Sequence, residues 1–250
     1  MPGELAGKVA LVSGAGKNIG RAIALAFAGD GASVIVNGRS DRAAVDAVVG
    51  EIVQRGGKAV AQMGDVSKAD EVHRVVDGGI KAFGGIDILV SNAGLRRQTP
   101  FLDMKYAEWR EILAVALDGA FLLAKEVAPS MIARGGGAIV GMSGISTHVG
   151  TPNRCHVSAS KAGLEGLMRA LAIELAPHNI TCNCVAPGAV DTVRGASAGT
   201  LPGTLADRSI PLGRRAAVDE IVAMVRLLAG PQGRYTTGQT IHINGGVFLT

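Results

Sequence analysis

A chain of 250 residues, 48% hydrophobic and 18% charged, can bury the core of one α/β domain and is too apolar to be disordered. Its net charge of +4 is spread along the chain without a five-residue basic block, and aromatic residues make up only 3%, so nucleic acid is not an expected partner. No stretch approaches the roughly 18 consecutive apolar residues of a membrane span. We therefore expect a cytoplasmic protein that binds no membrane.

Short β-branched runs alternate with longer helical patterns along the chain. Runs such as Val9-Ala-Leu-Val are apolar nearly throughout, which is typical of a parallel sheet covered by helices on both faces. The predicted strands are 8–13, 33–37, 58–63, 87–91, 138–143, 180–186 and 240–244. No Pro- or Ser-rich linker divides them, so residues 1–250 are predicted to form a single α/β domain, a doubly wound parallel sheet of about seven strands.

The segment 192–214 breaks this alternation and is rich in Gly, Ala, Ser, Thr and Pro. A loop of about 20 residues inside a compact domain is usually a lid or a disordered insert. Because the segment follows the carboxyl end of a strand, where ligands bind in such sheets, we favour a substrate lid.

Three cysteines are present, Cys155, Cys182 and Cys184. The last two alternate along a predicted strand, so the cysteines are interpreted as small buried hydrophobic side chains. Zinc would need four ligands at loop spacings, and no metal site is expected.

A glycine-rich turn, Ser13-Gly14-Ala15-Gly16-Lys17-Asn18-Ile19-Gly20-Arg21, follows the first strand and leads directly into a helical pattern. Glycines let the backbone approach a pyrophosphate closely, and the helix N-terminus presents free N–H groups to it. By itself the turn fits either dinucleotide binding or a tight strand-to-helix connection.

This turn resembles that of the short-chain dehydrogenases/reductases, whose Thr-Gly-x-x-x-Gly-x-Gly pattern falls on Ser13, Gly14, Asn18 and Gly20. Asn18 replaces a glycine, and Asn tolerates left-handed backbone angles better than most residues. Further motifs of the family are Asp65-Val66, Asn92-Ala93-Gly94, the stretch 158–163, Pro187-Gly188 with Thr192, and Asn244-Gly245-Gly246. The resemblance spans nearly the whole chain and implies a Rossmann-type fold, a nicotinamide cofactor, a small-molecule substrate and a homotetramer.

The residues that the resemblance assigns to the cofactor come from most of these motifs and from the end of the second strand. They are Gly14, Gly16, Lys17, Asn18, Ile19, Gly20, Arg39, Ser40, Asp65, Val66, Asn92, Ala93, Gly94, Lys161, Pro187, Gly188, Val190 and Thr192.

The end of the second strand favours NADP(H) over NAD(H). Gly38 stands where an NAD-preferring fold carries an acidic residue for the ribose hydroxyls. Arg39 can bind a 2′-phosphate with two hydrogen bonds, and Lys17 can supply a second charge. The alternative is that both cations are solvated surface charges.

The catalytic positions depart from the family. The family's Tyr, four residues before its Lys, carries the reaction's proton, and a Ser and an Asn accompany it. Here Lys161 is present, but Val157, Gly144 and Ala116 stand at the Tyr, Ser and Asn positions. The enoyl reductases of the family have their Tyr seven residues before the Lys, which is Arg154 here.

Two neighbours are candidates to take over, Ser143 and His156, each one residue before a lost position. A His without a Tyr also resembles the 2,4-dienoyl-CoA reductases of peroxisomal type, and His is the side chain best suited to proton transfer near neutral pH. On a helix His156 is rotated by about 100° from Val157. His156 therefore serves either as general acid or as a helix-start residue bonded to nearby backbone.

Arg96, Arg97 and His148 are predicted on the substrate side of the site. Arginine pairs bind carboxylates or phosphates bidentately, which favours an anionic or CoA-linked substrate, although both could be plain surface residues.

Two functions remain open. The first is an atypical NADP(H)-dependent oxidoreductase that transfers a hydride to or from a carbonyl or conjugated double bond, with catalytic residues Lys161, His156 and Ser143. The second is a pseudoenzyme that binds nucleotide as a structural or regulatory subunit, with an active paralogue as partner. Five apolar residues are predicted either at a tetramer interface or in the core: Leu113, Leu117, Phe121, Leu167 and Leu171.

Overall fold

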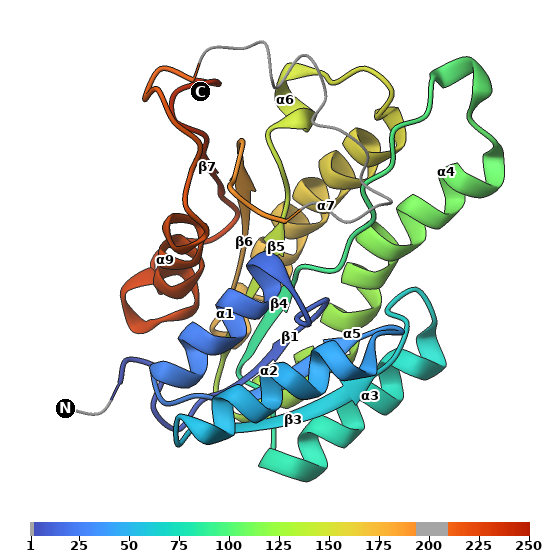
Figure 1. The fold of residues 1–250 in the computed structure, drawn as a ribbon. Helices are drawn as coiled ribbons and strands as arrows, with labels where there is room; N and C mark the ends of the chain where they lie inside the picture. The colour runs from blue at the N-terminus through green and yellow to red at the C-terminus, as the bar shows by residue number, and fades with distance from the viewer. Residues whose placement is uncertain (1–2, 194–209) are drawn as a thin grey trace.

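Seven parallel strands form one sheet in the order β3-β2-β1-β4-β5-β6-β7 (Figure 1). The computed structural model describes residues 3–193 and 210–250. All seven predicted strands are confirmed, with ends within one residue of those expected. They are β1 (Val9–Val12), β2 (Ser33–Gly38), β3 (Lys58–Met63), β4 (Ile88–Ser91), β5 (Gly137–Met142), β6 (Ile180–Pro187) and β7 (Thr240–Ile243).

Helices fill the connections between the strands. The α-helices are α1 (Asn18–Gly29), α2 (Arg42–Gln54), α3 (Ala69–Phe83), α4 (Tyr106–Leu113), α5 (Gly119–Ala133), α6 (Ser146–Val149), α7 (Cys155–Glu174) and α9 (Val218–Ala229). Shorter helical turns are η1 (Phe101–Asp103), η2 (Ala114–Asp118), η3 (Ala176–His178) and η5 (Pro231–Gly233).

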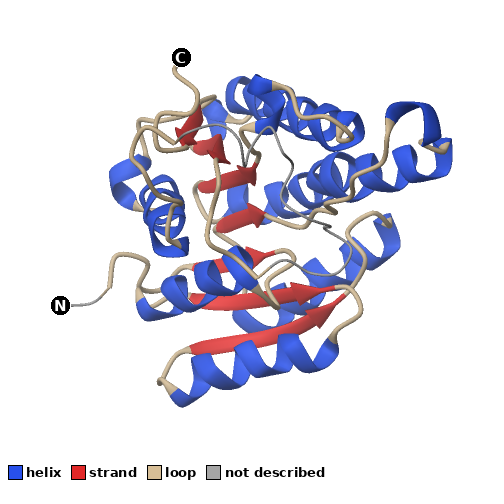
Figure 2. Cartoon of the chain, turned by 45° about the horizontal axis from the view of Figure 1, so that its top comes forward, coloured by secondary structure: helices blue, strands red, loops and turns tan. Residues whose placement is uncertain are grey.

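The inner strands β1, β4 and β5 are largely apolar because helices cover both faces of the sheet (Figure 2). The edge strands β3 and β7 are only partly buried. On β1, Val9 and Leu11 join a core with residues of α3, α5 and α7. Ala10 and Val12 join the opposite core, with residues of α1, α2 and α9. Each fully buried Val or Leu contributes about 1.5–3 kcal/mol relative to exposure. This double burial fixes where every strand ends, and with it the edge that carries the polar loops.

A ligand crevice follows from the order of the strands. β1 pairs with β2 on one side and with β4 on the other. The chain runs from β1 outward to β2 and β3, and then returns to β4 on the opposite side. The loops after β1 and β4 therefore diverge, which leaves the crevice at their carboxyl ends where ligands bind in such sheets.

One long helical stretch, 106–133, contains a π-helical turn, η2, between α4 and α5. The residues on both sides of the turn, Leu113 and Gly119, keep right-handed helical angles, so the stretch is not interrupted. Ala116 lies in this turn and is 3% exposed. Single π turns inside α-helices are frequent at functional sites.

The substrate lid is predicted at residues 192–214, and its residues 194–209 lie outside the described residues. On either side of it, Val190 and Ala216 form a parallel bridge beside the end of β6. No helix in the described ranges is long and apolar enough to cross a membrane.

The thiols of Cys182 and Cys184 are fully buried on β6, as predicted, whereas Cys155 is only half-buried. Burial raises the pKa of both strand thiols to about 12, so they stay protonated near neutral pH and are poor nucleophiles and ligands. Among residues 3–193 and 210–250, no group of three or more His, Cys, Asp or Glu side chains could hold a metal ion.

Candidate cofactor and substrate site

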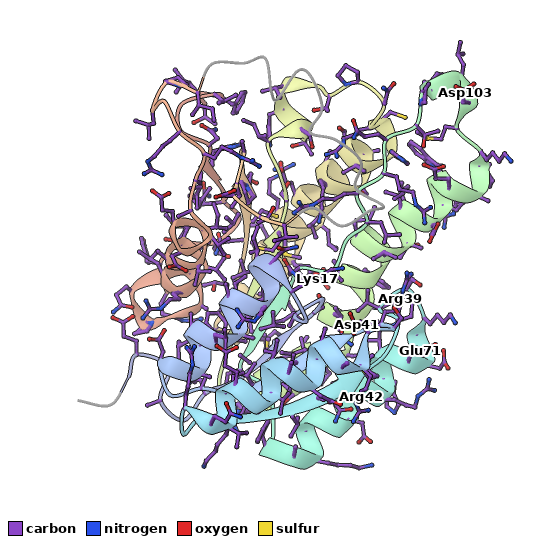
Figure 3. All side chains as sticks on the ribbon, viewed as in Figure 1. Lys17, Arg39, Asp41, Arg42, Glu71 and Asp103 are labelled. Atoms are coloured by element: carbon purple, nitrogen blue, oxygen red, sulfur yellow. The ribbon has the colours of Figure 1, made fainter. Side chains whose placement is uncertain are left out.

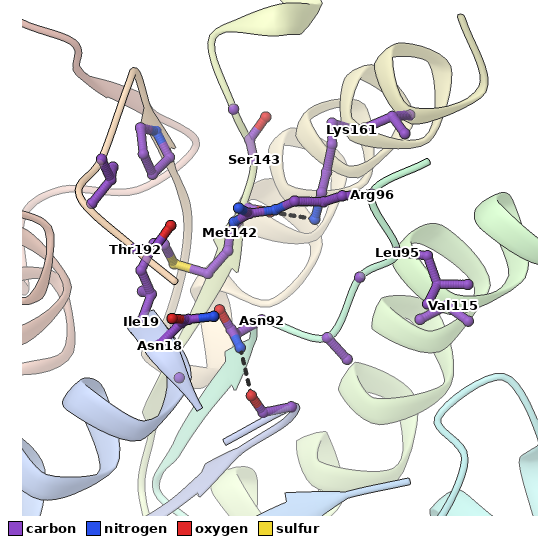
Figure 4. A pocket seen from close by; sticks show the side chains of 18 of the residues that line it. Asn18, Ile19, Asn92, Leu95, Arg96, Val115, Met142, Ser143, Lys161 and Thr192 are labelled. Carbon is purple, nitrogen blue, oxygen red and sulfur yellow. Dashed lines mark hydrogen bonds between the residues drawn. The ribbon is translucent and has the colours of Figure 1, made fainter. Parts of the chain in front are cut away.

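A cavity of about 400 Å³ opens at the carboxyl ends of the strands, in the crevice between β1 and β4 (Figure 4). Its walls contain every residue predicted to hold the cofactor except Gly16 and Ser40. A Cβ added at Gly16 would instead contact Ala44 of α2 at 3.4 Å, and Ser40 is exposed. Segments that are far apart in the sequence thus meet around one cavity.

The glycine turn has a backbone that few side chains would allow. Gly14 has a φ of 61° and Asn18 a φ of 51°, so Asn18 does adopt the left-handed angle for which its residue type suits it. A Cβ on Gly20 would lie 2.4 Å from the Gly14 carbonyl oxygen and 2.5 Å from Asn92 Nδ2. The start of α1 therefore packs against the turn with no room for a side chain.

Ser13 and Asn92 bind the turn after β1 to the end of β4. Ser13 Oγ accepts hydrogen bonds from the backbone N–H groups of Asn92 and Ala93, each at 3.0 Å. Asn92 Nδ2 donates to the carbonyl oxygens of Ser13 at 2.9 Å and Gly14 at 3.1 Å. These reciprocal bonds hold both edges of the crevice in one rigid unit.

Two cations stand near the end of β2. Lys17 directly precedes α1 and Arg39 follows β2, both at the carboxyl edge of the sheet (Figure 3). Arg39 Nη1 lies 3.8 Å from Asp65 Oδ2. Burial raises the pKa of Asp65, but hydrogen bonds from Ser67 and the charge of Arg39 outweigh it and hold that pKa below its usual value. The ionised Asp65 orients Arg39 beside the cavity.

These residues fit a dinucleotide phosphate. The turn excludes side chains where a pyrophosphate would approach the backbone, the N-terminus of the twelve-residue helix α1 faces the cavity, and the cations Lys17 and Arg39 line it.

Lys161 reaches into the cavity from α7, beside Arg96 (Figure 4). Its Nζ donates to the backbone carbonyl of Met142 at 2.5 Å. Burial, and then the charge of Arg96, lower the pKa of Lys161 from 10.5 to about 8. The ammonium is therefore present at neutral pH but is easily discharged.

Next to Lys161, the cavity wall is apolar where the family's proton donor would stand. Val157 is 6% exposed and, like Gly144, lines the cavity. Ser143 supplies the nearby hydroxyl, at the end of β5 (Figure 4). Ala116 does not line the cavity, although its neighbour Val115 does.

His156 is not brought to the cavity. Helix α7 begins at Cys155, so His156 already lies within the helix, turned away from the face that carries Val157. Its side chain is completely buried, and Nε2 lies 3.1 Å from Glu108 Oε1. The contact with the Glu108 carboxylate explains the position of the His156 side chain. Glu108 is distant in the sequence, so the sequence alone does not predict this contact.

Arg97 and His148, predicted on the substrate side, are also absent from the cavity lining. Arg97 forms a two-pronged ion pair with Glu111. His148 Nε2 lies 3.1 Å from Glu165 Oε1. Only Arg96 of these three predicted residues lines the cavity.

Three charged residues were missed by the sequence analysis. Arg154 and Arg215 line the cavity, and Arg154 is only 6% exposed. Glu165 is 4% exposed and accepts a hydrogen bond from Ser143. Helical spacing was the available signal, because residues 154, 157, 161 and 165 follow one face of α7. Arg215 had no such signal.

Comparisons with known proteins agree with this architecture. The family model described as enoyl-(acyl carrier protein) reductase matches residues 14–248. The 3-oxoacyl-[acyl-carrier-protein] reductase of Synechocystis sp. is 38% identical over 246 residues, which cover 98% of each chain. The enzyme of the same name from Staphylococcus aureus (strain N315) is also 38% identical, over 97% of this chain and 98% of that one.

Solved structures give the same result. A dehydrogenase/reductase from Sinorhizobium meliloti 1021 superposes with a TM-score of 0.90 at 34% identity, covering 98% of this chain and 96% of that chain. A 7α-hydroxysteroid dehydrogenase, solved with NADH and 7-oxo glycochenodeoxycholic acid, has a TM-score of 0.90 at 33% identity, covering 97% of this chain and 94% of that chain. With sequence and fold shared over nearly its whole length, this chain belongs to the short-chain dehydrogenase/reductase family of oxidoreductases.

Proposed function

We propose that the protein is an NADP(H)-dependent oxidoreductase that transfers a hydride to or from a carbonyl or conjugated double bond of a small anionic or CoA-linked substrate. One observation carries the proposal, the single cavity in which the glycine turn, Arg39 and Lys161 meet. The relatives named 3-oxoacyl-[acyl-carrier-protein] reductase make a 3-oxoacyl thioester the first substrate to try.

The chain's own residues would hold the cofactor along the crevice. The turn from Gly14 to Gly20 would bind the pyrophosphate, Arg39 and Lys17 the 2′-phosphate, and Lys161 the nicotinamide ribose. When bound, the nicotinamide supplies or accepts the hydride. Lys161 adds a positive charge close to the reacting atoms, where a developing negative charge on oxygen is stabilised.

The charges of the cavity wall favour an anionic substrate. Among the described residues that line the cavity, the cations are Lys17, Arg39, Arg96, Arg154, Lys161 and Arg215, against one carboxylate, Asp65. Arg39 and Lys17 are assigned to the cofactor, and Arg96 and Arg154 add positive charge to the rest of the same cavity wall, which favours a substrate with a carboxylate or phosphate. Arg97 is paired with Glu111 and is not assigned to substrate binding.

We further propose a homotetramer that packs through α5 and α7. Phe121 on α5 is 47% exposed and Ile173 on α7 is 79% exposed, so both helices present apolar side chains that a second copy would cover. Leu167 and Leu171 already pack partly against the core.

A second candidate function is a nucleotide-binding pseudoenzyme. Val157, Gly144 and Ala116 have no hydroxyl or amide to take the roles of the family's Tyr, Ser and Asn. Losing a proton donor usually costs about 10²–10⁴-fold in rate, so carbonyl reduction would be slow unless another group delivers the proton. An active paralogue would then carry the activity of the assembly.

The cofactor preference predicts a selective effect of Arg39→Ala. Losing a charge-assisted, two-pronged hydrogen bond to the 2′-phosphate should weaken NADPH binding by about 10–100-fold and leave NADH binding nearly unchanged. Fluorescence titration of both cofactors measures this. The matched control is Arg42→Ala, because Arg42 is paired with Asp46 on α2 at 2.9 Å and should not affect either cofactor. Equal losses for NADPH and NADH would contradict the assignment of Arg39.

Turnover decides between the two functions. NADPH oxidation is followed by absorbance with acetoacetyl-CoA, ketones, enones and dienoyl-CoA substrates. Oxidation with any of them supports the oxidoreductase. Tight NADPH binding with no oxidation across the panel would favour the pseudoenzyme, and no binding of either dinucleotide would refute the cofactor assignment.

A further inference from the structure

Glu165 is a buried carboxylate next to the cavity, and two hydroxyl groups and a histidine nitrogen converge on one of its oxygens. Its side chain is 5% exposed. Oε1 accepts a short hydrogen bond from Ser143 Oγ, lies 3.1 Å from His148 Nε2 and lies 3.4 Å from Thr147 Oγ1. A buried carboxylate needs such hydrogen-bond partners to offset its loss of contact with water.

The cluster connects the cavity with a more exposed histidine. Ser143 lines the cavity, and His148 is 23% exposed, whereas Glu165 lies buried between them. The His148 ring stacks edge-on against His242 at 4.5 Å and lies 5.0 Å from the Phe248 ring. These ring contacts fix the imidazole with Nε2 toward the carboxylate.

The order of the contacts is not that of a hydrolase triad. In a triad the His lies between the Ser and the carboxylate and takes the proton of the Ser. Here Glu165 lies between Ser143 and His148. Ser143 is therefore not activated as a nucleophile, and the arrangement suits proton transfer along a line.

Ser143 has a single hydroxyl proton, and this limits what it can do. While that proton is donated to Glu165, the Ser143 oxygen presents only lone pairs to the cavity and can accept from a substrate alcohol. When Glu165 carries a proton instead, it can donate to Ser143 Oγ, and the Ser143 proton becomes available to a substrate carbonyl oxygen. The protonation of Glu165 thus decides whether Ser143 is an acceptor or a donor.

We propose that Ser143, Glu165 and His148 form a proton relay that delivers the proton of carbonyl reduction in the absence of a tyrosine at Val157. This inference rests on the proposed function and names its substrate group as a carbonyl. The Ser143 O–H bond breaks as its proton moves to the carbonyl oxygen, Glu165 reprotonates Ser143, and His148 reprotonates Glu165 from solvent. The carbonyl carbon gains the hydride, so one hydride and one proton convert the ketone into an alcohol. Oxidation of the alcohol runs every transfer in reverse.

Other titratable groups face this cluster from each neighbouring element. They are His242 on β7, Cys184 on β6, and Lys161 and Arg169 on α7 itself. Burial, and then the charge of His148, hold the pKa of His242 below its usual value, and the pKa of Cys184 is about 12. Both groups stay neutral near pH 7. The His148 side chain is 23% exposed and that of Glu165 is 5% exposed, so His148 is the one of this pair that is open to solvent.

The first test is the pH profile of turnover. Glu165→Gln keeps the shape of the side chain but cannot pass a proton, so turnover of acetoacetyl-CoA should fall about 10²–10⁴-fold and lose the inflection that the relay gives to its pH dependence. NADPH affinity and the thermal unfolding midpoint should stay near wild type. The matched control, Glu174→Gln, changes an exposed residue on the same helix and should alter none of these. Turnover in Glu165→Gln that equals wild type at every pH would overturn the relay.

The second test needs no activity. The protein contains only five histidines, so the side chain of His148 can be followed by NMR in ¹⁵N-histidine protein and assigned with His148→Gln. If the three groups are coupled, Ser143→Ala removes a donor from Glu165 and shifts the His148 titration. An unchanged His148 titration in Ser143→Ala overturns the relay and leaves the proposed function standing. Wild-type protein that binds NADPH but oxidises it with no carbonyl substrate overturns the relay, and if enones and dienoyl-CoA substrates are inert as well, the proposed oxidoreductase function is overturned with it.

Discussion

Replacing Val157 by Tyr should raise carbonyl reduction by about 10²-fold or more, because it adds a proton donor of the kind that general acid catalysis uses. Val157 lines the cavity and lies four residues before Lys161 on α7, so both side chains point from the same face of the helix. The cavity of about 400 Å³ beside it has room for the larger ring. The Lys161 ammonium would lower the pKa of the new phenol and favour proton release.

The matched control for this gain is Val157→Phe, which introduces the same ring without the hydroxyl. The rate is measured as NADPH oxidation with acetoacetyl-CoA in both variants. A Tyr variant no faster than the Phe variant would mean that the hydroxyl does not reach the reacting oxygen. If the relay supplies the proton in the natural chain, Val157→Tyr should also restore turnover to Glu165→Gln, since the new donor bypasses Glu165.

The fold could be predicted closely because its signals are local. A strand that is buried on both faces is largely apolar, as the inner strands β1, β4 and β5 are. The glycine turn is local as well, since Gly14, Asn18 and Gly20 are required by the path of the backbone. The choice of Asn18 for a left-handed position follows from its residue type alone.

The roles of His156, Arg97 and His148 could not be predicted, because they depend on carboxylates from other segments. Glu108 holds His156, Glu111 holds Arg97 and Glu165 holds His148. No spacing in the sequence reveals these three pairings. Helical periodicity would have placed Glu165 on the face of Lys161, but its contact with Ser143 requires the three-dimensional path of β5.

Turnover and NADPH binding should decline together as the pH rises through about 8. The pKa of Lys161 is lowered from 10.5 to about 8, so its ammonium is present below this pH and is lost above it. If that charge is needed for the bound cofactor, NADPH affinity falls by at most about tenfold per pH unit above the midpoint. Lys161→Met should abolish this pH dependence and lower turnover by about 10²-fold or more.

Stability should change in the opposite direction over the same pH range. Because the pKa of Lys161 is lower in the folded protein, the folded state binds fewer protons than the unfolded state between about pH 8 and 10.5. The contribution of Lys161 to the free energy of unfolding therefore rises with pH across this window. Urea unfolding of wild type and Lys161→Met, measured at both ends of the window, isolates this contribution.

Arg96 and Arg97 test whether the alkaline midpoint of NADPH binding reports the pKa of Lys161. After burial, the charge of Arg96 is the next cause that lowers the pKa of Lys161, so Arg96→Ala should move the alkaline midpoint of NADPH binding upward. Arg97 stands next in the sequence but is paired with Glu111, and Arg97→Ala should leave the midpoint where it is. Arg96 lines the cavity and Arg97 does not, so a direct effect on Lys161 should differ between the two variants. Equal shifts in both variants would mean that the midpoint of NADPH binding depends on the net charge of the protein and not on the pKa of Lys161.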